Sequence, residues 1–192
     1  MKQKKRTAAL LMLAFFIPVF LFVCVMILCR VTPFGDKTLL IWDADGQYSA
    51  FLAAAQRIVT GRADPLYSLE KSAGSSLAGL IAYYMASPLN VLTALFAPGD
   101  IVSAFQAIVL VKIGFSGLTF MILLRRHNGA GWSGLLFSTA YALAGYTASY
   151  FWNIMWMDAL IALPLIALGI HGIIASRGGR LLYMLALGYA LF

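Results

Sequence analysis

The feature that most constrains this chain is an uninterrupted apolar run near its beginning, at residues 7–29. At about 1.5 Å per residue, a helix of this length crosses the ~30 Å hydrocarbon core of a bilayer. Cationic residues precede the run, as in a secretory signal, but the run is longer than the apolar region of such a signal. No small-x-small cleavage site follows it. We therefore expect residues 1–30 to form a retained signal anchor.

The composition extends this conclusion to the rest of the chain. Hydrophobic residues make up 62% of the sequence and charged residues 11%, proportions that soluble domains do not reach. Four further apolar segments follow, at residues 101–124, 132–150, 159–175 and 181–192. The predicted fold is therefore an all-α, polytopic transmembrane protein, with its second to fifth helices in residues 101–192.

The last of these segments is too short to cross a bilayer. Residues 181–192 would cover about 18 Å at the rise of an α-helix, against a ~30 Å core. A helix that ends inside hydrocarbon leaves its last carbonyl groups unsatisfied. We therefore expect this chain to be the front part of a longer protein, with the missing C-terminal part as its partner.

The distribution of charge predicts the orientation of the helices. If the N-terminus is cytoplasmic, the loops at residues 125–131 and 176–180 are cytoplasmic too. These three sites hold eight Lys and Arg residues and no acid, as the positive-inside rule requires, whereas all seven acids lie on or beside the other face. The net charge of +7 is divided among short turns and forms no continuous basic face, so we expect no nucleic-acid partner.

Residues 31–100 form an unusually long first loop on the extracytoplasmic side. Residues 44–60 predict an amphipathic helix with Phe51 and Leu52 on its apolar side and Gln56 on its polar side. Such a helix can lie in the headgroup plane of the bilayer. Residues 77–97 are apolar enough to span, but Pro88 at their centre disfavours a continuous helix. We expect two short, embedded or re-entrant helices that meet at Ser87 and Pro88.

Polar and aromatic residues gather where the first loop helix begins: Asp43, Asp45, Gln47 and Tyr48. Either aspartate can cap free N–H groups of the helix, and either can act chemically. The chemical roles are a general base, or a ligand of a divalent cation (Mg²⁺ or Mn²⁺) that bridges to phosphate. Gln47 shares a helix face with Asp43 and can orient a sugar hydroxyl. Tyr48 is either an interfacial aromatic or a surface on which a sugar stacks.

Five charged residues are candidates for binding a phosphorylated substrate. Arg57, Arg62 and Lys71 lie in the first loop, where they either contact a phosphate or anchor the loop to lipid headgroups. Lys112 lies near the middle of the second apolar segment, where a lone charge is costly, so it needs an acid or a lipid phosphate as partner. Asp158 either faces the same cavity as Asp43 or caps the following helix.

The order and spacing of these residues resemble those of the bacterial YfhO membrane proteins. The resemblance covers essentially the whole chain and rests on an N-terminal anchor followed by Asp43-x-x-x-Gln47-Tyr48 with Phe51, Gly74, Tyr83-Tyr84, Ser87-Pro88-Leu89-Asn90, Lys112 and residues 153–158. It implies a protein of the bacterial plasma membrane that is similar to GT-C glycosyltransferases. In those enzymes an acid in the first outer loop is the catalytic base, and two short helices lie along the membrane. Asp43 matches that acid.

The resemblance implies transfer of a sugar from a polyprenyl-phosphate carrier to a cell-envelope polymer such as lipoteichoic acid. Asp43 would be the base, with Asp45 and Gln47 positioning the acceptor or a metal. Arg57, Arg62 or Lys112 would hold the carrier phosphate. Two alternatives stay open: a lipid-linked saccharide transporter or flippase, in which Lys112 matters most, and a non-catalytic membrane scaffold subunit.

Overall fold

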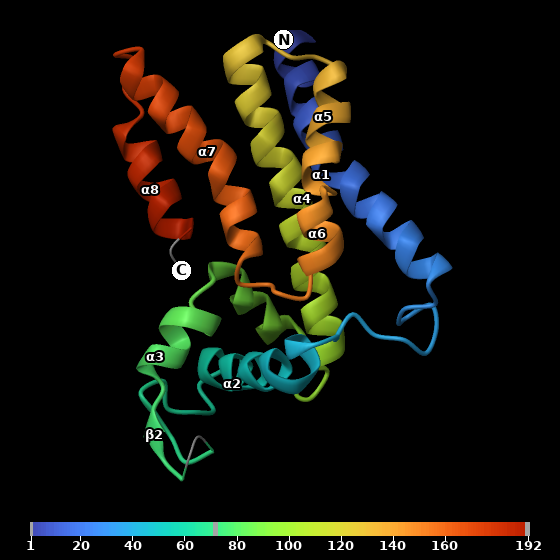
Figure 1. Cartoon of the computed structure of the whole chain (residues 1–192), viewed down its shortest axis with the longest axis vertical. Helices are drawn as coiled ribbons and strands as arrows, with labels where there is room; N and C mark the ends of the chain where they lie inside the picture. The colour runs from blue at the N-terminus through green and yellow to red at the C-terminus, as the bar shows by residue number, and fades with distance from the viewer. Residues whose placement is uncertain (1, 71–72, 191–192) are drawn as a thin grey trace.

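The computed structural model describes residues 2–70 and 73–190, which leaves Lys71 outside the described residues. It confirms the predicted all-α fold (Figure 1). Three of the described helices are long and apolar enough to cross a membrane: α1 (Lys2–Leu28), α4 (Ile101–Asn128) and α7 (Met157–Ile174). They stand in one bundle, and the first loop lies across one end of it, which we call the loop end.

The boundaries of α4 follow from its sequence. The Asp100 carboxylate accepts a hydrogen bond from the backbone N–H of Ser103 at 3.3 Å, which caps the first turn. At the other end, Gly129 has a φ of 65°, the left-handed conformation that ends many helices and that glycine adopts without strain. Arg125 and Arg126 in the last turn suit the negative end of the helix dipole.

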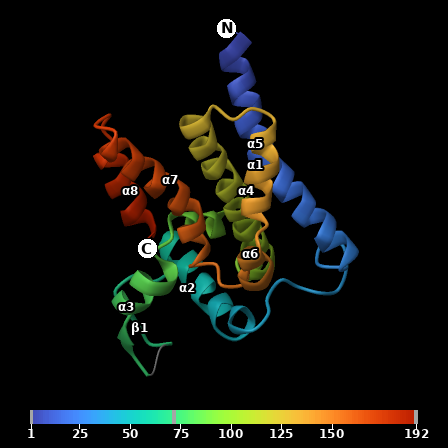
Figure 2. The ribbon, with the colours of Figure 1, turned by 45° about the horizontal axis from the view of Figure 1, so that its top comes forward.

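Helices α1 and α4 cross closely and then separate. A Cβ atom on Gly117 would collide with the carbonyl oxygen of Ala14, so glycine permits the close approach. The rings of Phe15 and Phe115 pack edge to face beside this crossing, 5.3 Å apart. Beyond Pro18, which removes a backbone donor within α1, the helix leans away from α4 in both views (Figures 1 and 2).

The expected third apolar segment, residues 132–150, is not one helix. It forms α5 (Ser133–Ala142) and α6 (Gly145–Tyr150), because Ala144 is extended, with a ψ of 164°, and the chain turns there. Glycine at position 145 lowers the helix propensity at the break. Neither α5, with 10 residues, nor α6, with 6, is long enough by itself to cross a bilayer, and the apolar composition gave no sign of this interruption.

Helices α7 and α8 (Arg180–Ala190) form a tight antiparallel hairpin. A Cβ atom on Gly169 or Gly172 would come within 3 Å of the backbone at Tyr183 or Gly178, respectively. The described part of α8 has 11 residues, which is too short to span a bilayer.

The amphipathic helix predicted at residues 44–60 is confirmed as a π-helical turn, η1 (Ala44–Tyr48), that continues as α2 (Ser49–Val59). The prediction for Gln56 is wrong, because this side chain is buried, with 5% of its surface exposed. Its amide donates hydrogen bonds to the carbonyl oxygens of Thr93 at 2.8 Å and Phe96 at 3.0 Å. Gln56 therefore links α2 to the segment that contains Thr93 and Phe96.

A two-stranded hairpin, β1 (Tyr67–Ser68) with β2 (Ser75–Ser76), extends from the loop end.

The predicted break at Ser87 and Pro88 is also confirmed. The helical turns α3 (Ala78–Leu80) and η2 (Ile81–Met85) precede it, and the 3-10 helix η3 (Pro88–Leu95) follows at an angle of 90°.

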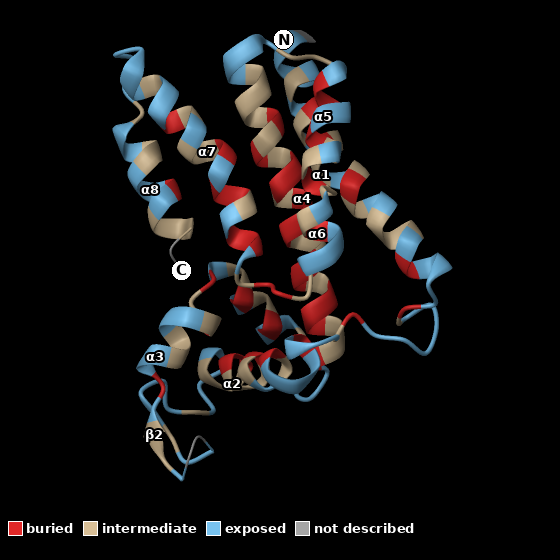
Figure 3. Ribbon diagram, in the orientation of Figure 1, coloured by how far each residue is buried: buried red, intermediate tan, exposed pale blue. Residues whose placement is uncertain are grey.

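Buried residues concentrate on α4 and on the faces that meet it (Figure 3). The larger apolar core lies towards the loop end and includes Tyr48, Leu52, Phe105, Ile108 and Ile154. The first loop is thus packed into the same core as the membrane helices, which fixes the position of η1.

Candidate functional site

Asp43 stands at the start of η1 with its carboxylate exposed. Trp42 before it has a left-handed backbone, with a φ of 53°, a conformation that bulky residues rarely adopt and that turns the chain into η1. The side chain of Asp43 makes no capping hydrogen bond to the helix. Asp45 and Gln47 are exposed as well. Of the two roles open to Asp43, capping therefore finds no support, and its carboxylate is available to a ligand.

Beside Asp43, aromatic side chains from three parts of the fold meet in one group, which we call the aromatic cluster. Tyr48 is its centre: its ring stacks on Trp152, with centroids 6.3 Å apart, and packs on Tyr84 at 5.7 Å. Consecutive ring contacts join seven of the described aromatic residues: Tyr48, Phe51, Tyr83, Tyr84, Tyr146, Tyr150 and Trp152. Tyr83 and Tyr150 are exposed, so part of the cluster forms a surface.

The phenol of Tyr48 is kept protonated by its surroundings. Burial, and then the nearby Asp43 carboxylate, raise its pKa from 10.0 to about 12, with smaller contributions from neighbouring tyrosines. Both effects disfavour the phenolate, the first through desolvation and the second through repulsion between like charges. At neutral pH Tyr48 is therefore a hydrogen-bond donor close to an ionisable acid.

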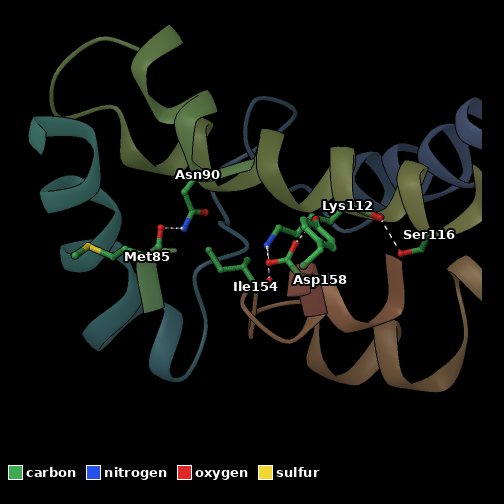
Figure 4. Close-up of polar contacts among 7 residues, drawn as sticks. Met85, Asn90, Lys112, Ser116, Ile154 and Asp158 are labelled. Carbon is green, nitrogen blue, oxygen red and sulfur yellow. Dashed lines mark hydrogen bonds and ion pairs between the residues drawn. The ribbon is translucent and has the colours of Figure 1, made fainter. Parts of the chain in front are cut away.

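Within the helix bundle, Lys112 of α4 and Asp158 of α7 form a buried ion pair (Figure 4). The ammonium nitrogen of Lys112 lies 2.8 Å from Oδ2 of Asp158 and 2.7 Å from the carbonyl oxygen of Ile154. The hydroxyl group of Tyr189 donates a hydrogen bond of 2.6 Å to Oδ1 of Asp158. Both charged residues are fully buried. Each neutralises the other, and a single buried charge without a partner would destabilise the fold.

The ion pair supports the aromatic cluster through one short turn. Lys112 holds the backbone of Ile154, and Trp152, two residues earlier, stacks on Tyr48. Ile154 and Tyr48 also belong to the same apolar core. The pair in the membrane bundle thus fixes the turn that carries part of the cluster.

Arg57 and Arg62, the two arginines predicted to bind phosphate in the first loop, lie away from Asp43 and the aromatic cluster. Arg57 forms an ion pair with Glu70, beside a pocket of about 330 Å³ between α2 and the hairpin. Arg62 is exposed in the turn after α2. Fourteen residues at helical rise place Arg57 about 20 Å along the helix from Asp43.

Asp43 and Asp45 supply two exposed carboxylates for a cation. Among residues 2–70 and 73–190, no group of three or more His, Cys, Asp or Glu side chains is suited to a metal. Mg²⁺ commonly binds one or two carboxylates together with the phosphates of a substrate. Asp43 and Asp45 are two residues apart in one helical turn, a spacing that does not place both carboxylates on one helix face, so a divalent cation at this place stays a prediction.

Comparison with known protein families identifies the family of this chain. The family described as bacterial membrane protein YfhO matches residues 14–192. The chain belongs to the YfhO family. No curated protein and no solved structure matched it. The predicted resemblance is thus confirmed over nearly the whole chain, and with it a bacterial membrane protein.

In this YfhO-family chain, the candidate residues fall into three places. Asp43, Asp45, Gln47 and Tyr48 lie together at the start of η1, with the aromatic cluster beside them. Lys112 and Asp158 lie together in the bundle, where each is the partner of the other. Arg57 and Arg62 belong to neither group, and the role of all these residues in substrate binding stays a prediction.

Sequence reasoning missed four residues that complete the arrangement: Trp152, Tyr146, Tyr150 and Tyr189. The aromatic residues at positions 146–152 resemble an ordinary interfacial belt, since Trp and Tyr are common at membrane surfaces. Only the fold brings them to Tyr48, about 100 residues earlier in the chain.

Proposed function

We propose that this YfhO-family protein is a GT-C-like glycosyltransferase of the bacterial plasma membrane. It transfers a sugar from a polyprenyl-phosphate carrier to a cell-envelope polymer such as lipoteichoic acid. The loop end faces outward and the N-terminus faces the cytoplasm, in keeping with the positive-inside rule. The sugar donor then meets its acceptor on the side of the membrane where the polymer lies.

The observation that carries this proposal is the free carboxylate of Asp43 next to the aromatic cluster. Asp43 takes the proton from a hydroxyl group of the acceptor, and the hydroxyl oxygen attacks the anomeric carbon of the donor sugar. The bond from that carbon to the carrier phosphate breaks, and its electron pair leaves with the phosphate. Attack from the face opposite the phosphate inverts the anomeric centre.

The neighbours of Asp43 position the reactants. The exposed rings of Tyr83 and Tyr150 offer apolar faces for a sugar, and the phenol of Tyr48 donates a hydrogen bond. Gln47 and Asp45 orient the acceptor hydroxyl. Lys112 and Asp158 act indirectly, because each already neutralises the other in the bundle. Arg57 and Arg62, at the far end of α2, contact headgroups or a distant part of the polymer.

Transfer of labelled sugar from a polyprenyl-phosphate donor by the full-length protein tests the proposal. Removal of a general base typically costs 10²–10⁴ in rate, so we expect Asp43→Asn to lose at least ~100-fold. Asp36→Asn, which changes another exposed acid of the same loop, is the matched control and should leave transfer unchanged. Equal transfer by Asp43→Asn and the wild type would reject the assigned base. Absence of transfer by the wild type with every donor would favour a transporter.

A further inference from the structure

An apolar groove runs along the outer half of α1, where this helix leans away from the bundle. It has a volume of about 410 Å³, within the range of about 300–1,000 Å³ that is typical of ligand pockets. One wall comes from α1 and the turn after it, with Phe22, Val25 and Cys29. The other wall comes from α6 and the residue after it, with Ala148 and Phe151. The rings of Phe22 and Phe151 meet edge to face at 5.9 Å.

The groove opens towards the bilayer. Leu21 and Val25 line it from a helix that is long enough to span the membrane, yet 41% and 52% of their surfaces are exposed. Such apolar exposure on a spanning segment is the surface that lipid chains cover. Thr147 also lines the groove, and its buried hydroxyl group has no hydrogen-bond partner among the described residues.

The groove reaches the candidate site at two points. Leu39 lines it and lies four residues before Asp43, so the chain between them spans at most about 14 Å. Phe151 lines it and is followed directly by Trp152, which stacks on Tyr48. A chain-like ligand in the groove therefore has one end in the bilayer and the other beside the aromatic cluster.

We propose that this groove between α1 and α6 binds the isoprenoid tail of the lipid-linked sugar donor. The inference rests on the proposed function, because that function supplies a ligand with an apolar tail and a sugar-phosphate head. The tail enters sideways from the bilayer between α1 and α6, and the head reaches Asp43. The remainder of the tail stays in the surrounding lipid.

Cys29 gives a readout that does not depend on sugar transfer. This thiol is free, exposed and part of the groove wall. The full-length Asp43→Asn variant in lipid nanodiscs is treated with a maleimide, and modification of Cys29 is followed by mass spectrometry. With long-chain polyprenyl phosphate at ten times its Kd, the free fraction falls to about one tenth, so modification slows about tenfold. Inorganic phosphate should not slow it.

Two variants on α6 provide the comparison within the groove. Ala148→Trp places a large ring in the groove from an exposed position and should abolish the protection by lipid. Ser149→Trp adds the same ring at the next exposed position, which does not line the groove, and should keep the protection. Helical circular dichroism confirms that both variants fold.

The outcomes separate this inference from the proposed function. No protection of Cys29 by polyprenyl phosphate, or equal protection in Ala148→Trp, overturns the groove as the tail site. A Cys29 that does not react even without lipid overturns it too, since another segment of the protein then fills the groove. Protection without any sugar transfer by the wild type would keep the lipid site and reject the glycosyltransferase.

Discussion

Replacing one partner of the buried ion pair should destabilise the protein strongly. Lys112→Met keeps the length of the side chain but removes the ammonium group. Among the described residues, the Asp158 carboxylate then keeps only the hydrogen bond from Tyr189, and the Ile154 carbonyl oxygen loses the hydrogen bond from Lys112. Because both charges are fully buried, water cannot replace the lost partner.

The expected magnitude follows from this burial. Breaking a buried pair by removing one partner costs about 3–5 kcal/mol, because an uncompensated charge stays in a medium of low dielectric constant. For a chain of this size, each kcal/mol lowers Tm by about 2–4 °C, which gives a decrease of roughly 6–20 °C. Asp158→Asn should have a similar effect. The double variant removes both charges and should regain most of the lost stability.

Thermal unfolding in detergent, followed by helical circular dichroism, measures these differences. Lys37→Met serves as the control, because Lys37 is exposed in the first loop and its loss should leave Tm unchanged. Additive effects of Lys112→Met and Asp158→Asn in the double variant would refute the argument. They would mean that the two side chains do not depend on each other.

Three further predictions concern the first loop. Gln56→Leu should lower the free energy of unfolding by about 1–3 kcal/mol, since two carbonyl oxygens lose their hydrogen-bond donor. An unchanged Tm would show that this link between α2 and η3 does not stabilise the fold. Arg57→Gln should lower the free energy of unfolding by less than about 1 kcal/mol, and should not change it in high salt, because the ion pair with Glu70 is largely exposed. A large loss of stability in high salt would contradict this. In an alkaline titration of tyrosinate absorbance, the difference between wild type and Tyr48→Phe should appear near pH 12, and a midpoint near pH 10 would contradict the cause given for its raised pKa. The same shift means that the stability contributed by the neutral phenol is complete below pH 10 and is lost as the pH rises towards 12.

Much of the fold could be predicted because it depends on local properties of the sequence. Length and apolar composition are sufficient to identify α1, α4 and α7, since a bilayer requires a minimum span. The break at Pro88 could be predicted because proline lacks a backbone N–H and disfavours helical geometry at the residue before it. The interruption at Ala144 could not be predicted in this way, because a small residue followed by Gly145 is compatible with a continuous membrane helix.

The candidate site was predictable only in part. The cost of a buried charge indicated that Lys112 needs a partner, but it did not identify Asp158, which lies 46 residues away. Helical periodicity identifies only the apolar face of a helix, so it predicted an exposed Gln56. It contains no information on the carbonyl oxygen of Thr93, which lies on another element and accepts a hydrogen bond from the buried Gln56. The aromatic cluster depends on contacts of Tyr48 in η1 with Tyr84 in η2 and with Trp152 after α6, which no local pattern encodes.

The most direct test of the account is a single-turnover measurement with the full-length protein at saturating polyprenyl-phosphate-sugar donor. It compares the wild type with Asp43→Asn and is combined with the donor Kd of each. If Asp43 is the general base, the rate of sugar transfer falls at least ~100-fold while the donor Kd stays unchanged. An unchanged rate in Asp43→Asn would contradict the central claim, and would leave the carboxylate as an ordinary polar group at the start of η1.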